Sequence, residues 1–531
     1  MKNKLSYSEF WEKLPILDSF ELEKHINLVD PQNRSSAIFP VYLRTGVETR
    51  IQFLSYWLQK KENNILLRIT TRNLLGNQID RIYQSICKYK SNTILASELF
   101  KNHSEGFCGS IEIEFFSKNK PLYTFPAVSL SFANKFSSSV VHTCIRTYNE
   151  DEIINDYAIN LPQTGFDVEF NDINKNFICF FGGKKNSYSL NIELFENGIK
   201  KNYPLILKNE ICGQAHILYL EDIISNADKE IFRKPKCSIN HDFNDIFPRF
   251  FVGIESPCNT PTLTHTFFDT SKLTNSQSEL GKSSLRTCNN NPDFYFDATF
   301  CIPIYPINYF DTSIKSYSQN IEVKNDGYLS IYSEQGDKLF SRLLKKEELS
   351  TLCGIGELAI SKLIFELKLK KNEFYSIKFS FVNKINPFPK RFKLGLNLKR
   401  KDIRYGTNIC FSPLIMMEDL IKKPFSRRWF PVCGLQKFVA SIHNTSFLRR
   451  EIDNHSTSFS LEFINHDGSK LSREKILSIN ESLFIDPSTD RQLNNFLGEK
   501  GGLCMVTANT FVFNAYYFSM TEKQIGGDHA Y

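Results

Sequence analysis

Hydrophobic residues recur at every second position along most of the chain. Between residues 188 and 194 the apolar positions are Tyr188, Leu190, Ile192 and Leu194, and the polar positions are Ser189, Asn191 and Glu193. Successive side chains of a β-strand point to opposite faces, so a period of two indicates strands with one buried face. Residues 362–370 alternate in the same way, with Leu363, Phe365, Leu367 and Leu369 opposite lysines. We therefore expect a mainly β protein.

The N-terminal segment is the exception to this pattern. Within residues 6–28, Ser6 and Glu9 have the spacing of a capping box. Phe10, Trp11 and Leu14 then fall near one helical face. Pro15 limits the length of that helix, so we predict a short helical segment ahead of the strands.

Internal repetition first appears in the hairpin turns. Four predicted strands run into a glycine turn and a second strand, at Gly76-Asn77, Asn197-Gly198, Gln335-Gly336-Asp337 and His466-Asp467-Gly468. Glycine adopts the positive φ angles that tight hairpins require. The turn glycines lie 122, 138 and 132 residues apart, a spacing that suits β-sandwiches of about 100 residues with linkers. We predict tandem antiparallel β-sandwich domains whose layout resembles immunoglobulin-like domains. Three larger units are the alternative to four.

Two shorter recurring segments indicate how the chain divides into units. The segments expected to begin a unit are Ile38-Phe39-Pro40, Ile246-Phe247-Pro248 and Trp429-Phe430-Pro431, because proline fits the start or the edge of a sheet. An apolar residue followed by cysteine comes after each turn, at Cys108, Cys212, Cys353 and Cys504. The predicted division is a helical segment with sandwich 1 (1–158), sandwich 2 (159–245), sandwich 3 with a long loop at 270–293 (246–425), and sandwich 4 (426–531).

Composition and cysteine usage narrow the class of protein. The chain is 41% hydrophobic, which fits folded domains rather than disorder. Its 13 cysteines are odd in number and include no Cys-x-x-Cys pair, so we expect reduced thiols rather than a disulfide framework or a zinc ribbon. Neither a signal peptide nor an 18-residue apolar run is present, and we expect a cytoplasmic protein without a membrane span.

The chain lacks the common catalytic signatures. It has no phosphate loop, dinucleotide fingerprint, His-Glu-x-x-His motif, Gly-x-Ser-x-Gly elbow or EF-hand. We therefore expect no cofactor and no metal. A binding protein or scaffold is favoured over an enzyme.

The chain has only ten histidines, so the positions of these few residues are informative. In residues 264–269 a period of two places His265, Phe267 and Asp269 on one strand face, and His142 and Arg146 occupy a similar Val/Thr-rich setting. We take His142, Arg146, His265 and Asp269 as candidate ligand-binding residues. The alternative is that both histidines lie at strand ends and are hydrogen-bonded to backbone.

The C-terminal residues Gly526-Gly527-Asp528-His529-Ala530-Tyr531 form an unusual end for a chain. Two glycines give the backbone freedom, and a carboxylate, an imidazole and a phenol follow. Asp528 and His529 are further candidate ligand-binding residues. A docking segment and a frayed end remain the alternatives.

Positive charge is concentrated in residues 368–404. This segment has 12 basic and 2 acidic residues, whereas the whole chain has a net charge of only +7. Aromatic residues are interleaved, as in single-strand nucleic-acid sites. The candidate polyanion-binding residues are Lys390, Arg391, Lys393, Lys399, Arg400 and Lys401. Most of these lysines equally fit a solvated strand face that protects a sheet edge.

Three functions remain open from the sequence. The favoured one is a non-catalytic protein that binds a glycan or another macromolecule, or serves as an assembly scaffold. The second is an enzyme acting on a sugar or polysaccharide precursor, with a site between sandwich units. The third is a polyanion binder. The expected partner is a glycan or another protein rather than nucleic acid, and self-association is left open.

Overall fold

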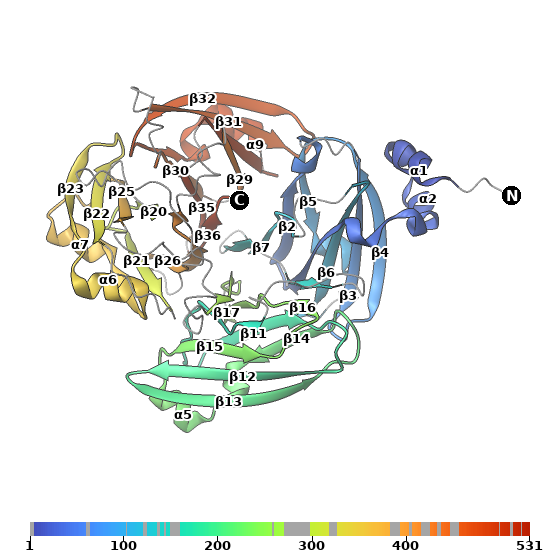
Figure 1. The fold of residues 1–531 in the computed structure, drawn as a ribbon, viewed down its shortest axis with the longest axis horizontal. Helices are drawn as coiled ribbons and strands as arrows, with labels where there is room; N and C mark the ends of the chain where they lie inside the picture. Colours follow the sequence, from blue (N-terminus) through green and yellow to red (C-terminus); the bar gives the residue numbers. More distant parts are fainter. Residues whose placement is uncertain are drawn as a thin grey trace.

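Each of the four turn glycines joins two antiparallel neighbouring strands in the computed structural model (Figure 1). Their φ angles are 88° for Gly76, 82° for Gly198, 87° for Gly336 and 92° for Gly468, as the sequence predicted. The structure describes residues 5–531 except 60–63, 102–103, 120–124, 135–137, 143–144, 149–159, 258–259, 270–297, 318–325, 383–392, 403–405, 416–424, 433–436, 446–455, 499, 510–512 and 522.

Paired sheets form four sandwich units, which we call units 1 to 4. The strands of unit 1 are β1 (Arg34–Leu43), β2 (Glu48–Leu54), β3 (Ile65–Asn73), β4 (Gln78–Ile86), β5 (Ser91–Leu95), β6 (Gly106–Ser117), β7 (Ser129–Ala133) and β8 (Ser138–His142). Those of unit 2 are β10 (Gln163–Thr164), β11 (Lys175–Phe181), β12 (Ser187–Glu196), β13 (Ile199–Lys208), β14 (Ala215–Tyr219), β15 (Lys236–His241), β17 (Phe251–Glu255), β18 (Thr264–His265) and β19 (Phe267–Phe268).

Units 3 and 4 follow in the same manner. The strands of unit 3 are β20 (Ala298–Ile304), β21 (Phe310–Ser316), β22 (Asp326–Ser333), β23 (Lys338–Leu343), β24 (Gly356–Ala359), β25 (Tyr375–Val382), β26 (Leu394–Arg400), β27 (Thr407–Phe411) and β28 (Leu414–Ile415). Those of unit 4 are β29 (Ser426–Val432), β30 (Lys437–His443), β31 (Ser456–Asn465), β32 (Lys470–Ser478), β33 (Ser482–Ile485), β34 (Gly502–Ala508), β35 (Asn514–Met520) and β36 (Ile525–His529).

All four units share one strand order. Counted from 1 to 8 within a unit, one sheet has the order 1-6-3-4 and the facing sheet has the order 5-2-7-8. In units 2 and 3 a ninth short strand, β19 or β28, is added beside the first. The sandwich architecture is confirmed, whereas this order differs from the ABED and CFG sheets of an immunoglobulin domain.

One expected unit start lies outside the paired sheets. Ile38 and Trp429 lie in the first strands of units 1 and 4, as expected, but Ile246 and Phe247 form β16 (Ile246–Phe247), which pairs with β9 (Arg146–Thr147) in a separate small sheet. After β16 the chain returns to unit 2, where β17 pairs with β11. We propose that unit 2 extends to Phe268, rather than ending at residue 245. The predicted long loop at 270–293 lies outside the described residues.

Short helices occupy the connections. The α-helices are α1 (Tyr7–Lys13), α2 (Ser19–Lys24), α3 (Ala96–Leu99), α4 (Leu220–Ile223), α5 (Asn226–Ile231), α6 (Lys346–Cys353), α7 (Ile360–Glu366) and α9 (Arg491–Leu497). The 3₁₀ turns are η1 (Leu14–Ile16), η2 (Ile26–Leu28), η3 (Pro31–Asn33), η4 (Tyr56–Gln59) and η7 (Pro487–Thr489). No helix in the described part is long and apolar enough to cross a membrane.

One helix matches the sequence prediction and another replaces a predicted strand. Ser6 and Glu9 form the predicted capping box of α1, and Phe10 and Trp11 are buried. The strand predicted around residues 362–370 is wrong, because residues 360–366 form α7. Ile360 and Ile364, four residues apart, are its buried positions, and this helical spacing outweighs the alternation of Leu363 and Phe365.

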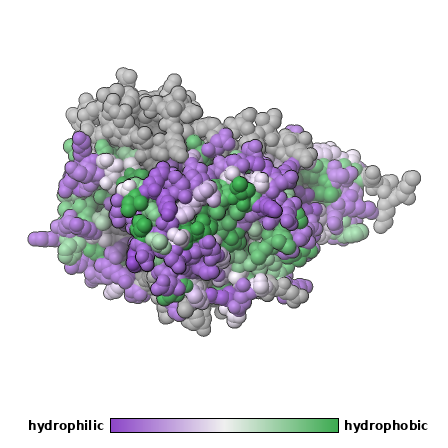
Figure 2. All heavy atoms as spheres, turned by 90° about the horizontal axis from the view of Figure 1, so that it is seen from below, coloured by the Kyte–Doolittle hydropathy of each residue, from purple (hydrophilic) through white to green (hydrophobic). Residues whose placement is uncertain are grey.

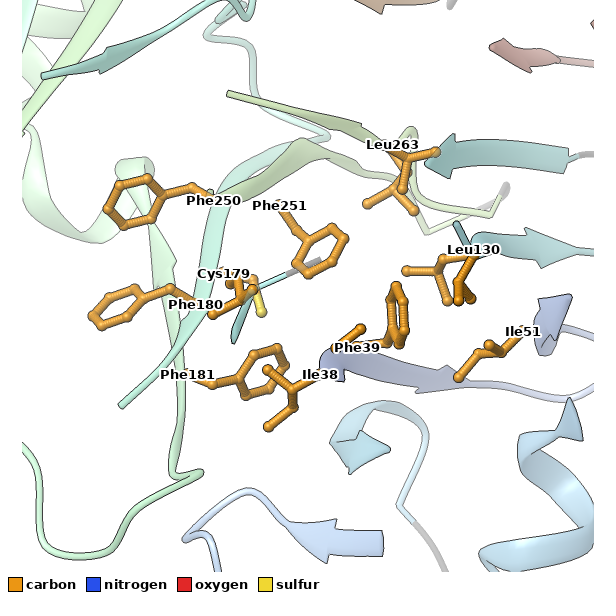
Figure 3. Packing of buried hydrophobic residues seen from close by; sticks show 14 of the residues in the cluster. Ile38, Phe39, Ile51, Leu130, Cys179, Phe180, Phe181, Phe250, Phe251 and Leu263 are labelled. Atoms are coloured by element: carbon orange, nitrogen blue, oxygen red, sulfur yellow. The ribbon is translucent and has the colours of Figure 1, made fainter. Parts of the chain in front are cut away.

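The units stand in a ring in chain order, with the C-terminus at its centre (Figure 1). The cores are continuous at three junctions, because one apolar cluster joins units 1, 2 and 4 and a second joins units 3 and 4. Figure 3 shows Ile38 and Phe39 of unit 1 beside Phe181 and Phe251 of unit 2, and the rings of Phe39 and Phe251 lie 6.1 Å apart. Such shared apolar burial holds neighbouring units together.

Three of the hairpin turns also contact the next unit. A Cβ on Gly76 would lie 2.8 Å from Gln214 N, just before β14, and one on Gly336 would lie 3.0 Å from Glu481 N, just before β33. A Cβ on Gly468 would lie 3.6 Å from the Cβ of Lys90, just before β5. Among the described residues, nothing lies within 4 Å of a Cβ built on Gly198, so this turn glycine differs from the other three.

The fourth strands form the outer rim of the ring (Figure 1). Each presents an exposed aliphatic side chain, namely Ile79, Ile206, Leu343 and Ile476. Figure 2 shows one face of the molecule, on which hydrophilic and apolar side chains are interleaved. Lysines such as Lys200 and Lys201 and the proline Pro204 on β13 are typical of protected sheet edges.

Candidate functional site

The eighth strands of the four units meet on the ring axis. β8 contacts β36 and β18, and β27 contacts the same two strands, so the four form a closed circuit. Thr264 on β18 donates a hydrogen bond to the carbonyl of Asn408 on β27 at 2.9 Å. A Cβ on Gly526 of β36 would lie 2.7 Å from Ser139 Cα on β8, so glycine permits backbone contact there.

Four of the candidate ligand-binding residues meet at one end of this circuit. We call His142, His265, Asp528 and His529 the axial cluster. The His142 ring lies 4.9 Å from that of His265 and 4.2 Å from that of His529, measured between centroids. The Nδ1 of His142 lies 2.7 Å from Asp528 Oδ2. Three units therefore contribute to one site.

Hydrogen bonds fix the tautomers of two of these histidines. The Nδ1–H of His265 donates to the carbonyl of Thr266 at 2.7 Å, and that of His529 donates to the carbonyl of Ala530 at 2.9 Å. A carbonyl oxygen only accepts, so each Nε2 retains a lone pair. The His265 Nε2 is buried and has no hydrogen-bond partner within the described residues.

Burial sets the electrostatics of the axial cluster. It lowers the pKa of His142 to about 3, with help from the nearby cations Arg249 and Lys393, and lowers the pKa of His529 to about 3. Burial raises the pKa of Asp528 to about 7. The imidazoles are therefore neutral at pH 7. Neutral imidazoles and a carboxylate are metal-ligating groups, and the donor atoms of His142, Asp528 and His529 all lie within 4.8 Å of one another.

The C-terminal segment is ordered at this site. β36 pairs with β35, and the N–H of Tyr531 donates to the carbonyl of Trp429 at 2.9 Å. The rings of Tyr531 and Trp429 stack at 4.5 Å. The frayed end considered from the sequence is therefore wrong, because both the backbone and the side chains of the tail are held.

Arg146 and Asp269 are not part of the axial cluster. Arg146 donates to Ser36 Oγ at 3.0 Å and lies over the ring of Tyr148, at the junction of units 1 and 2. Asp269 follows β19, and its N–H donates to the carbonyl of Pro162. The predicted common face of His265, Phe267 and Asp269 is wrong, because β18 pairs with β17 in one sheet and β19 pairs with β10 in the other.

The basic candidates do not gather into one described patch. Lys390 and Arg391 lie outside the described residues. The guanidinium of Arg400 donates to the carboxylate of Asp402 and to the carbonyl of Thr521. The Nζ of Lys401 lies 3.9 Å from Asp311 Oδ1. Lys393 faces the axial cluster, and Lys399 lines a cleft described next.

A cleft of about 570 Å³ lies between units 2 and 3. We call it the inter-unit cleft. Its inner end reaches Ser139 and Gly526 on the axis. The charged residues that line it are Lys234, Lys236, Lys315 and Lys399 with Asp167, Glu169, Asp311 and Glu357. Positive and negative charges balance, so the cleft is polar without net charge.

One ion pair crosses the cleft. Lys315 Nζ of unit 3 lies 2.6 Å from Asp167 Oδ2 of unit 2 and 3.9 Å from Glu357. Lys236 of unit 2 donates to the carbonyl of Ser316 in unit 3 at 3.3 Å. Burial lowers the pKa of Lys236 to about 8. These contacts fix the separation of the two walls.

Three amides along the cleft carry buried polar atoms without partners in the described part of the chain. They are the Oδ1 atoms of Asn397 and Asn408 and the Nε2 of Gln524. Asn397 and Asn408 face each other across β26 and β27. A buried polar group without a partner costs free energy, and native proteins have few of them. Twenty-five such atoms occur in the described residues, and these three amide atoms belong to residues that line the cleft.

Comparisons with known proteins add no function. A scan against models of protein families and a search of curated proteins both find no match. Among solved structures, the tetra-tandem repeat in the extending region of a large adhesion protein matches 88% of this chain and 91% of that chain, with 8% identity and a TM-score of 0.09. A TM-score this low supports no conclusion about fold or function.

The cleft residues are not among the candidates that the sequence pointed to. Asn397, Asn408 and Gln524 come from three segments of units 3 and 4, and each looks like an ordinary polar position. The histidines were found because they are scarce. No local pattern marks a site whose walls come from different units.

Proposed function

We propose that the protein is a non-catalytic binding protein that holds a neutral oligosaccharide, part of a larger glycan, in the inter-unit cleft. The observation that carries the proposal is the set of unpartnered amide atoms of Asn397, Asn408 and Gln524 along this cleft. A sugar hydroxyl both donates and accepts, so neighbouring hydroxyls can satisfy an amide oxygen and an amide N–H together.

The balance of charge supports a neutral ligand over a polyanion. Four lysines and four carboxylates line the cleft, and Lys315 lies between Asp167 and Glu357. A polyanion would meet as many negative as positive groups. The position also fits, because small-molecule sites are commonly found at domain interfaces.

The test is binding of the purified full chain to an array of neutral, aminated and acidic oligosaccharides, followed by calorimetry with the neutral glycans that bind. We expect Asn397→Ala to weaken binding about tenfold, since one hydrogen bond contributes on the order of 1 to 1.5 kcal/mol. Asn191→Ala is the matched control, because Asn191 also has a buried Oδ1 without a partner but does not line the cleft.

Two results would overturn the proposal. One is the absence of binding to every neutral glycan on the array. The other is an affinity that Asn397→Ala and Asn191→Ala change equally, since the cleft would then have no special part in binding.

A further inference from the structure

The axial cluster has a composition that glycan binding does not require. Three imidazoles and a carboxylate from units 1, 2 and 4 meet where the first and last sandwiches close the ring. His142 comes from β8, His265 from β18, and Asp528 and His529 from β36.

We propose that the axial cluster binds a divalent transition metal ion, with Zn²⁺ as the best fit and His142, Asp528 and His529 as ligands. The donor atoms of these three residues lie within 4.8 Å of one another. Ligands around a tetrahedral zinc ion at 2.0–2.1 Å are about 3.4 Å apart, so small side-chain rotations complete the site.

His265 is the fourth ligand. Its side chain is 2% exposed, and its Nε2 has no hydrogen-bond partner in the described part of the structure. Its ring centroid lies 4.9 Å from that of His142. Two imidazoles that share a tetrahedral zinc ion have centroids about 5 Å apart, which follows from the usual Zn–N distance.

The hydrogen bonds of two of the histidines are those of metal-binding imidazoles. Backbone carbonyls hold the Nδ1–H groups of His265 and His529. A metal-ligating histidine usually donates its second ring nitrogen to a carbonyl or carboxylate, which fixes the ring and directs the other nitrogen to the metal.

The surrounding charge selects the kind of metal. Arg249 Nη1 lies 3.4 Å from His265 Nδ1, and Lys393 is also near the histidines, so the site has one carboxyl group and two neighbouring cations. Ca²⁺ and Mg²⁺ depend on several oxygen ligands, which the described residues of this site do not offer. Zn²⁺ and Co²⁺ bond strongly to neutral imidazole and tolerate this setting better.

The metal would join the first unit to the last. His142 belongs to unit 1 and Asp528 and His529 belong to unit 4, almost 400 residues later in the chain. A ligand that binds the folded state and not the unfolded chain stabilises the fold. The proposed role is therefore closure of the ring rather than catalysis.

The test uses the full chain stripped with a chelator and titrated with Co²⁺, Zn²⁺ or Mg²⁺. We expect about one Co²⁺ per chain with a visible ligand-field spectrum, displacement of Co²⁺ by Zn²⁺, and no effect of Mg²⁺. His529→Gln should weaken Co²⁺ binding by about a hundredfold or more. His443→Gln, at a buried histidine outside the axial cluster, should leave binding unchanged.

The proposal is overturned if the unaltered chain gives no Co²⁺ spectrum, a result that does not depend on any variant folding. It is also overturned if His529→Gln and His443→Gln bind Co²⁺ equally well. Neither result bears on glycan binding, because the inter-unit cleft is lined by other residues.

Discussion

The N–H of Ala215, the first residue of β14, donates a hydrogen bond to the carbonyl of Leu74, two residues before the turn glycine Gly76. The N–H of Ser482, the first residue of β33, donates in the same way to Glu334, two residues before Gly336. The β-hairpin turn therefore has two roles. It reverses the chain within one unit, and it caps the fifth strand of the next.

This double role predicts unequal effects for two similar glycines. Gly76 and Gly198 have φ angles of 88° and 82°, so alanine at either position costs about 1 kcal/mol in backbone strain. Alanine at Gly76 would also clash with the backbone of Gln214, and we expect a further 1 to 3 kcal/mol of destabilisation, roughly. Urea denaturation of Gly76→Ala and of its control Gly198→Ala measures the difference. Equal losses would contradict a contact between units.

A second prediction concerns the ring axis. A Cβ on Gly526 would lie 2.7 Å from Ser139 Cα and 2.9 Å from the carbonyl of Ser138. We expect Gly526→Ala to lower the free energy of unfolding by about 1 to 3 kcal/mol, because backbone cannot move aside as a flexible side chain can. Amide exchange in β8 and β36 should accelerate more than elsewhere. Unchanged exchange in these two strands would show that they do not pack as described.

A third prediction concerns acid sensitivity at His443. Burial lowers its pKa to about 3, while Ser482 and Ser441 hold its two ring nitrogens. The unfolded chain takes up a proton near pH 6.5, so stability is present above that pH and is lost as the pH falls toward 3. The loss between pH 7 and pH 5 is roughly 2 kcal/mol from this one group.

His443→Gln should remove that part of the pH dependence. Urea denaturation at pH 7 and pH 5 compares the variant with His466→Gln, which alters an exposed histidine in the turn after β31. The expected result is a smaller difference between the two pH values for His443→Gln alone. An identical difference in all three proteins would mean that His443 is protonated within the fold.

The strand class, the four turns and the helical start followed from the sequence because they depend on local chemistry. Gly76 and its three counterparts mark turns since few other residues adopt a positive φ, and the alternation at Tyr188 and Leu190 reflects burial of one strand face. Two of the recurring cysteines also have equivalent places, because Cys108 of unit 1 and Cys504 of unit 4 both lie in sixth strands.

Two local sequence patterns gave expectations that the fold does not match. Ile246-Phe247-Pro248 shares its Phe-Pro pair with the first strands of units 1 and 4, yet its strand pairs with Arg146 and Thr147 outside both main sheets. The common strand face drawn through His265 and Asp269 fails because the chain passes from one sheet to the other at Thr266. Sheet membership depends on pairing partners far along the chain, which a local pattern does not contain.

The order of residues along the chain specifies which of them bend the backbone and which strand faces are apolar, and the scarcity of histidine marks candidate site residues. The contact of His142 with Asp528 and the place of Asn397 beside a cleft arise from the folded arrangement. The reason is physical: a turn or a strand face depends on neighbouring residues, whereas these sites depend on how four sandwiches pack around one axis. That packing is set by contacts between residues hundreds of positions apart.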